Sequence, residues 1–346
     1  DEIDQLTTEI DRVSETTKFN ETYLLKGDKG ATKNVYMNGH DAGLKGTLTD
    51  SAKSATFVMD ELKAGNKVTI AGKEYSIGST VADAKASYAK AADGDKVTID
   101  GTEYTVVGAT GTEDAGANKL KVTSLDAKVK DGSVVSYKTS KLTVMTDKDT
   151  DGVDDDDSSV ISKDIAEGKI VSELTAANNI GTVKHAATVA KATADGKTTY
   201  TISKGYATVA DTLSFNLHVG ADADMTNKIN VSIDSMDSAS LGIKGLNIKD
   251  DSGNAATYAV DAISDAISKV SSQRSSLGAV QNRLEHTINN LDNVVENTTT
   301  AESRIRDTDM ASEMVNYSKN NILAQAGQSM LAQANQSTQG VLSLLQ

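Results

Sequence analysis

The stretch that decides the fold is AVDAISDAISKVSSQRSSLGAVQNRLEHTINNLDNVVE, residues 259–296. Its large aliphatic side chains recur three or four residues apart, with one step of seven across Arg274. They are Val260, Ile263, Ile267, Val270, Leu277, Val280, Leu284, Ile288, Leu291 and Val294. This spacing places all of them along one side of an α-helix, as in a coiled coil. The sequence therefore predicts a long helix whose apolar stripe needs a partner.

The segment that follows contains many large apolar residues and no charged ones. Positions 320–346 contain no Lys, Arg, Asp or Glu. Within this segment and just before it, the large apolar residues include Met310, Met314, Ile322, Leu323, Met330, Leu331, Leu342 and Leu345. Water solvates an uncharged amphipathic helix poorly, so we expect this segment to be buried against other protein.

The amino terminus has a shorter stripe of the same kind. Apolar residues at positions 3, 6, 10 and 13 predict a helix from position 1 to about position 19. Between about 20 and 50, glycines alternate with Asn and Asp, which predicts turns and short strands. The first segment thus offers a short partner for the long helix.

The middle of the chain contains an internal repeat. KVTIAGKEY at 67–75 recurs as KVTIDGTEY at 96–104. Each copy has two β-favouring runs around an Ala-Gly or Asp-Gly pair, which predicts a β-hairpin. The Ala-rich segment 81–92 between the copies predicts a short helix, and two further strands are predicted at 213–219 and 229–233. The pattern indicates small β-rich modules.

Composition excludes several classes of protein. The 346 residues include no Cys, which excludes disulfides, thiolate metal sites and a cysteine nucleophile. The net charge of −14 argues against general nucleic-acid binding, which needs a cationic surface. No apolar run approaches the length of a membrane span, and the acidic start DEID does not resemble a signal peptide.

The residue patterns of common enzyme sites are also missing. The four histidines, at positions 40, 185, 218 and 286, are scattered and form no His-Glu-x-x-His motif. The sequence has no Gly-x-Ser-x-Gly elbow and no phosphate loop of the Walker type. We therefore expect neither enzyme activity nor a cofactor.

One acidic segment has the pattern of a metal site. Asp147, Asp149 and Asp151, followed by Gly152, match positions 1, 3, 5 and 6 of a calcium loop. Position 12 holds Ser158 in place of the usual bidentate Glu, although the residues at 154–157 could substitute. The alternative is a loop without metal, whose many aspartates between 147 and 157 repel one another and stay extended.

Several segments, in order along the chain, resemble bacterial flagellins. They are IDRVSETTKFN at 10–20, SSLGAVQNRL at 275–284, AESRIRDTDMA at 301–311, QAGQSMLAQANQ at 325–336 and VLSLLQ at 341–346. The strand region around 215–233 also fits, so the resemblance covers about 1–48 and about 207–346. The middle of the chain has no such match.

The resemblance implies an α+β fold: a rod-like core of long antiparallel coiled-coil helices with a β-rich variable insert of small hairpin-containing modules. It implies an amino-terminal part of the outer core at 1–48 and the insert at 49–207. The carboxyl-terminal part of the outer core would be 208–300, and the inner core helix 301–346. The tail residues named above, with Ile263, Ile267, Val270, Leu277, Leu284 and Leu291, are expected to serve helix packing and assembly.

The function implied by the resemblance is that of a secreted structural subunit of the flagellar filament, which self-assembles through terminal helices for motility. The implied partners are other flagellin subunits, an export chaperone that binds 305–346, and Toll-like receptor 5, with Gln281 and Arg283 facing the receptor. Neither nucleic acid nor membrane insertion is expected. The lack of Cys suits export as an unfolded chain, because no oxidative folding has to be managed.

Two expectations concern the start of the chain and the competing classes of function. The chain opens inside the family's second amino-terminal segment, so we expect it to form no normal filament by itself and to signal weakly through the receptor. A calcium-dependent adhesin or surface-layer fragment is the first alternative, prompted by the acidic loop and the repeats. An enzyme carried on the insert is the second, and it would need a cluster of His or paired carboxylates.

Overall fold

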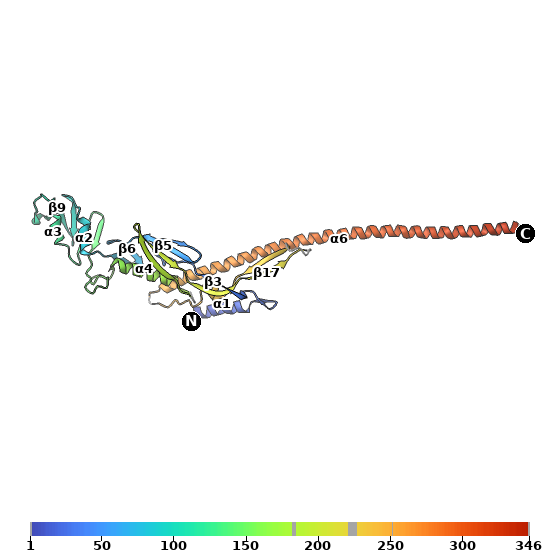
Figure 1. Ribbon diagram of the computed structural model, residues 1–346, viewed down its shortest axis with the longest axis horizontal. Helices are drawn as coiled ribbons and strands as arrows, with labels where there is room; N and C mark the ends of the chain where they lie inside the picture. Colours follow the sequence, from blue (N-terminus) through green and yellow to red (C-terminus); the bar gives the residue numbers. More distant parts are fainter. Residues whose placement is uncertain (1, 182–184, 221–226, 251, 345–346) are drawn as a thin grey trace. The chain divides into compact units, whose positions relative to one another are not determined.

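The computed structural model describes residues 2–181, 185–220, 227–250 and 252–344 (Figure 1). The chain forms two compact units, which are described separately. Unit 1 comprises residues 1–214 and 232–274, and unit 2 comprises 215–231 and 275–346.

The dominant element is α6, a helix of 91 residues over Asn254–Leu344. The chain contains no proline, so no ring interrupts the main-chain hydrogen bonds of the helix. At its start the Asp250 carboxylate accepts hydrogen bonds from the main-chain N–H groups of Gly253 (2.8 Å) and Ala255 (3.1 Å). The predicted long helix is confirmed, and it is continuous across positions 300 and 301, where the sequence suggests a boundary.

The amino-terminal helix α1, Glu2–Thr16, packs against the first turns of α6. Ile3 joins a cluster that contains Ala259 and Ala262, and Ile10 joins one that contains Ala266. Apart from α6, no helix in the described ranges is longer than α1, so the expected long antiparallel coiled coil is not found within this chain and stays a prediction.

A four-stranded sheet in the order β14-β15-β5-β4 forms the main core of unit 1 together with α4. The strands are β14 Thr188–Ala194, β15 Lys197–Ser203, β5 Ser54–Asp60 and β4 Thr47–Asp50, and the helix is α4 Lys163–Ala177. Phe57 and Tyr200 from the sheet and Ile170 and Leu174 from the helix are fully buried in this core. Helix α4 was not predicted from the sequence, although Ser162 caps it and most of its buried side chains recur every three or four residues.

Three hairpins, not two, make up the repeat in unit 1. They are β6–β7 (Lys67–Ile70, Lys73–Ile77), β8–β9 (Lys96–Ile99, Thr102–Val106) and β11–β12 (Val134–Tyr137, Ser140–Thr143). Each is preceded by a glycine with positive φ, at +84° for Gly65, +86° for Gly94 and +79° for Gly132. Each glycine N–H donates to a carbonyl at the far end of its hairpin, at 2.8, 2.9 and 3.1 Å. The third copy has few identical residues and follows at a wider spacing than the one between the first two, so the sequence comparison missed it.

Short parallel strands and helices complete the hairpin modules. β13 (Val160–Ile161) pairs with β7, and β10 (Lys119–Leu120), which follows the short 3₁₀ turn η1 (Ala115–Ala117), pairs with β9. Helices α2 (Val81–Tyr88) and α3 (Val122–Asp126) contribute the buried Tyr88 and Leu125 to a second core with Val97. The predicted hairpins and the short helix after the first copy are confirmed.

The remaining strands form pairs. They are β1 Lys18–Phe19 with β2 Thr22–Tyr23, β3 Asp28–Tyr36 with β16 Tyr206–Asp211, and β17 Leu213–His218 with β18 Lys228–Ile233. The last pair confirms the two strands predicted from the sequence. Of the helices in the described residues, none combines the length and the hydropathy needed to cross a membrane.

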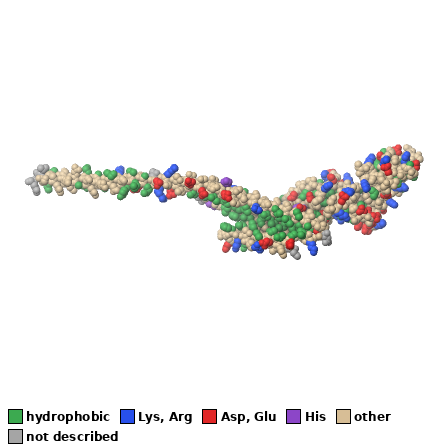
Figure 2. Space-filling model, turned by 180° about the vertical axis from the view of Figure 1, so that it is seen from behind, with side chains coloured by type: hydrophobic (Ala, Val, Ile, Leu, Met, Phe, Trp, Pro, Cys, Tyr) green, Lys and Arg blue, Asp and Glu red, His purple; other side chains and the backbone are tan. Residues whose placement is uncertain are grey.

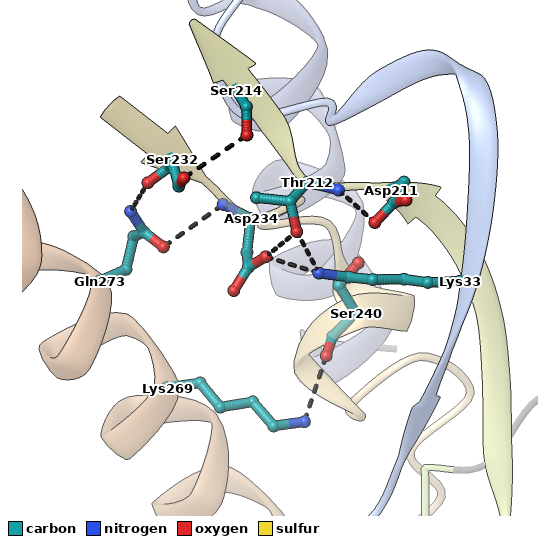
Figure 3. Close-up of polar contacts among 9 residues, drawn as sticks. All are labelled: Lys33, Asp211, Thr212, Ser214, Ser232, Asp234, Ser240, Lys269 and Gln273. Carbon is teal, nitrogen blue, oxygen red and sulfur yellow. Dashed lines mark hydrogen bonds and ion pairs between the residues drawn. The ribbon is translucent and has the colours of Figure 1, made fainter. Parts of the chain in front are cut away.

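A polar cluster in unit 1 joins the strand ends to α6 (Figure 3). The Gln273 side chain of α6 accepts a hydrogen bond from the Asp234 N–H (3.3 Å) and donates one to the Ser232 carbonyl (3.0 Å). The Asp234 carboxylate in turn accepts hydrogen bonds from Lys33 Nζ (2.5 Å) and Thr212 Oγ1 (2.6 Å). The strands and the long helix therefore meet at one hydrogen-bond network, in which the bonds to the Asp234 carboxylate are charge-assisted.

A second contact fastens α6 to the short helix α5 (Ser238–Leu241). Lys269 Nζ donates to the Ser240 carbonyl at 3.2 Å (Figure 3). Burial lowers the pKa of the Lys269 ammonium; the carboxylate of Asp265 opposes this shift and the positive charge of Lys204 adds to it, both more weakly. Lys269 thus gives up part of its solvation to hold the start of α6 in place.

We predict that Asp234→Asn weakens the folded state at neutral pH but not in acid. Partial burial alone would raise the pKa of Asp234, but the hydrogen bonds from Lys33 and Thr212 and the charge of Lys33 outweigh it, so the pKa lies below the ordinary 3.8. A carboxyl whose pKa is lowered by folding stabilises the folded state above its unfolded pKa, and this contribution is lost as pH falls through the folded value. Urea unfolding from neutral pH into acid should show the difference between wild type and variant shrinking below pH 3.8.

The matched control for this experiment is Asp60→Asn, which removes a carboxylate whose side chain is 93% exposed. That variant should show no comparable pH-dependent difference. A gap between wild type and Asp234→Asn that stays constant, or widens in acid, would contradict the role given to the Lys33–Asp234 pair.

Candidate assembly surface on the long helix

The carboxyl-terminal half of α6 exposes an unusual number of large apolar side chains. Those between 58% and 71% exposed are Ile305, Met310, Met314, Val315, Tyr317, Ile322, Leu323, Met330, Leu331, Val341 and Leu342. We call these residues the tail surface; all of them belong to unit 2. Side chains of this kind are normally inside a folded protein, and a large exposed group of them marks an interaction site.

The apolar side chains of the tail surface do not share one side of the helix. Ile322 and Leu331 are separated by about two and a half turns at roughly 3.6 residues per turn, so they point in opposite directions. A helix that is apolar on several sides is typical of a helix buried on all of them. A single helix packed along one side would therefore leave part of the tail surface in water.

Local apolar surfaces follow the same segment. Met314, Val315, Ile322 and Leu323 line a shallow, open surface together with Ser318 and Lys319. Ile305 and Met310 line another, beside Ala301. Both are open, so they fit protein side chains laid along the helix better than an enclosed small molecule.

Beyond Lys319, electrostatics do not oppose burial of the tail surface. The last charge on α6 is Lys319, so the final turns can be desolvated without removing an ionised group from water. The ion pair between Arg306 and Glu302 at 3.1 Å brackets Ile305 at the start of the tail surface, and both side chains are mostly exposed. Such exposed pairs contribute little, about 0 to 1 kcal/mol.

The residues predicted for packing fall into three groups. Leu277, Leu284 and Leu291 are half-buried on the stretch of α6 that shares unit 2 with residues 215–231. Within residues 215–231, Ile229 and Val231 are buried. The predicted tail residues from Met310 to Leu342 are exposed, whereas Leu345 lies outside the described residues.

The third group lies on unit 1. Ile263 and Ile267 of α6 are exposed, as are Leu6 and Val13 of α1, while Val270 packs beside Ala266. Figure 2 shows hydrophobic side chains gathered over the part of the molecule that holds α1 and the first turns of α6. We call the four exposed residues the α1–α6 face, because α1 and α6 already pack together through their neighbours Ile3 and Ile10.

Sequence reasoning missed part of the tail surface. Ile305, Val315 and Tyr317 are as exposed as the residues that were predicted, but the prediction did not include them. The signal that could have found them is the recurrence of large apolar residues on more than one side of this helix.

The two remaining groups of predicted site residues are placed as follows. Gln281 and Arg283 are exposed on α6, and the Gln281 side chain donates to Glu285 at 3.1 Å. Asp147, Asp149 and Asp151 come together, each offering a carboxylate oxygen within 4.8 Å of the others.

The family comparison covers the long helix. Residues 260–345 match the model of the bacterial flagellin C-terminal helical region. This range contains most of α6, including the tail surface and the half-buried leucines.

Individual relatives extend the likeness over the whole chain. A flagellin of Clostridium tyrobutyricum is 34% identical over 349 aligned residues, which cover 98% of this chain and 71% of that protein. The putative flagellin YvzB of Bacillus subtilis (strain 168) is 53% identical over 39% of this chain and 83% of its own length. The flagellin of the same strain is 48% identical over 40% of this chain, and the match spans about half, 52%, of that protein.

The match to the Clostridium protein includes the hairpin modules as well as both ends of the chain. One family therefore accounts for three parts of the chain: the helical region, the strand pair before it and the amino-terminal helix. On this evidence the chain belongs to the flagellin family, whose members are structural subunits of the bacterial flagellar filament and not enzymes.

Proposed function

We propose that this chain enters the filament through α6, with the tail surface covered on several sides by neighbouring copies. The proposal rests on one observation: apolar side chains such as Ile322 and Leu331 point in opposite directions and are both about two-thirds exposed. Burial of such a side chain contributes roughly 1.5–3 kcal/mol. A repeated contact that does not close on itself produces a helical filament, which for this family lies outside the cell.

The proposal also assigns each part of the chain to a region of the filament subunit. Residues 1–48 and 208–300 would form the outer core, 301–346 the inner core helix, and 49–207 the outward-facing insert. The two hydrophobic cores that lie largely within the insert support this division, because neither contains a residue of α6. The long coiled-coil pairing of α6 would then be made with helices of other copies.

We predict that a charge placed on either side of the tail surface weakens association. Ile322→Lys and Leu331→Lys each put an ammonium where a neighbouring copy would exclude water, and a buried unpaired charge is costly. Each should raise the protein concentration needed for association at least about tenfold, equivalent to about 1.4 kcal/mol. Sedimentation against concentration, with negative-stain microscopy of the pellet, measures this.

Thr139→Lys is the control, because it adds the same charge at an exposed hairpin turn of the insert. It should leave the concentration dependence unchanged. If only one of the two helix variants weakened association, burial on opposite sides of α6 would be wrong. If neither did, the tail surface would not be an assembly surface.

We also propose that the same tail binds the flagellin export chaperone before secretion. The exposed apolar residues within 305–346 support this, because a surface of this kind needs cover until assembly. Deletion of residues 305–346 should abolish co-purification with the purified chaperone, since it removes every residue of the tail surface. Retention of the chaperone by the shortened chain at unchanged stoichiometry would count against this partner.

A third proposal places Toll-like receptor 5 on α6 at Gln281 and Arg283. Both side chains are exposed. The Gln281 side chain donates a hydrogen bond to Glu285, one turn further along the same helix. The double variant Gln281→Ala/Arg283→Ala should lower receptor reporter activity about tenfold or more if these two residues carry the contact. The helix should remain intact by circular dichroism, because alanine favours helices. An unchanged reporter response would remove both residues from the contact.

A further inference from the structure

The first strands of the three hairpins differ in how their outer edges are covered. β8 and β11, which begin the second and third hairpins, pair antiparallel with each other, so each covers the edge of the other. β6, which begins the first hairpin, pairs with β7 and is the outermost strand of its sheet. Within the described residues no strand pairs with its other side, so one of three equivalent edges is open.

The open strand has the same sequence as a covered one. β6 and β8 both read Lys-Val-Thr-Ile, at 67–70 and 96–99. The identical side chains nevertheless differ in exposure. Val97 is buried and Thr98 is half-buried, whereas Val68 is half-buried and Thr69 is exposed. The same residues are therefore more exposed where the neighbouring strand is missing.

The main chain of β6 is turned toward the open edge. Ser76, which lies opposite Lys67 in the hairpin, donates its N–H to the Ser159 carbonyl at 2.8 Å, away from β6. Opposite residues of an antiparallel pair either both face each other or both face away. Lys67 thus presents its N–H and C=O to the open edge, and Thr69 does the same two residues later. Both residues also line a groove beside the strand.

The charge on β6 does not block this edge. An edge lysine often prevents strand addition, because a partner strand would have to cover its charge. Lys67 instead binds Glu74 of its own hairpin at 2.6 Å. On β8 the equivalent Lys96 binds Glu103 at 2.7 Å, and β8 is paired with β11 all the same. An ion pair of this kind is therefore compatible with a neighbouring strand.

The register of β8 and β11 identifies a suitable partner. The fourth residue after Gly94 is Thr98, the fourth after Gly132 is Ser136, and these two residues lie opposite each other. On either side, the third residue of one strand lies opposite the fifth of the other. The pairing is thus symmetric about its centre, as it would be if two copies of one strand were related by a two-fold axis.

We infer that β6 pairs antiparallel with β6 of a second copy of this chain. The register of β8 and β11 then places Thr69 opposite Thr69 of the second copy, and Val68 opposite Ile70. Because both copies use the same edge, the contact is complete with two chains and does not continue into a third. It is separate from the tail surface and does not depend on the function proposed above.

The internal pair has a polar anchor that β6 lacks. Asp100 accepts hydrogen bonds from the Val134 N–H at 2.8 Å and from Ser133 Oγ at 3.1 Å, which fasten the end of β8 to β11. The equivalent position in the first hairpin is Ala71. The contact between copies therefore relies on main-chain hydrogen bonds and short side chains, and free chains associate through it only weakly.

Charge exchange at Thr69 tests the inference in the full chain. All chains carry Leu331→Lys, which reduces association through the tail surface. Thr69→Asp and Thr69→Lys each place like charges opposite each other, so each should raise the concentration needed for dimers at least about threefold. An equimolar mixture of the two should restore dimers, because opposite charges then meet. Sedimentation velocity against concentration measures this.

The matched controls use Thr193, an exposed threonine of β14, which is also the outermost strand of its sheet. Thr193→Asp and Thr193→Lys should leave the dimers unchanged. A mixture of the two Thr69 variants that dimerises no better than either alone would overturn the inference, because Thr69 would then not face itself.

Cross-linking supplies a second readout that does not require stable dimers. The chain has no Cys, so Thr69→Cys introduces a single thiol. Opposite Cα atoms of a hydrogen-bonded antiparallel pair lie about 5.5 Å apart, within the reach of a disulfide. Thr69→Cys should form disulfide-linked dimers with oxidised glutathione, and Thr193→Cys should not. Equal yields from both, or no dimer from Thr69→Cys, would mean that β6 does not bind a second copy.

Discussion

The structure depends on one constraint: a chain of this composition cannot cover its own longest helix. Over its first turns α6 is partly covered by α1 and α5, and in its middle it is half-buried in the unit it shares with the β17–β18 ribbon. Beyond that it has no cover from the described residues, yet its apolar side chains continue to Leu342. Helix propensity alone rarely sustains so long an exposed helix. Association therefore completes the fold as well as the filament.

Polar contacts at the start of α6 suit attachment within the chain, and apolar contacts at its end suit association between copies. At its start, directional bonds from Gln273 and Lys269 fix α6 against the strands and α5. At its end, the uncharged surface offers contacts without direction. Directional polar contacts specify one arrangement, whereas apolar contacts tolerate small changes in how neighbours pack.

Sequence reasoning succeeded where periodicity is strong and local. The stripe from Val260 to Val294 predicted α6, and the Ala-Gly and Asp-Gly pairs predicted two hairpins. It failed where a feature does not depend on a local sequence pattern. The third hairpin shares few residues with the first two, among them its leading glycine, Gly132, and the exposed Val315 and Tyr317 were not predicted. In the acidic loop the sequence supplied the motif, but only the structure shows that Asp147, Asp149 and Asp151 converge, where an extended segment was expected in the absence of metal.

The unequal spacing of the three hairpins has a consequence for how the insert can change. The connection after the second hairpin, 107–133, is longer than the connection after the first, 78–95. The longer connection includes the turn η1 (Ala115–Ala117), and each hairpin keeps its own glycine closure. Lengthening a loop costs entropy only as the logarithm of its length. The mostly exposed stretch 109–114 of the longer connection is therefore free to lengthen and diversify, whereas α2 and α3 are fixed by the buried Tyr88 and Leu125.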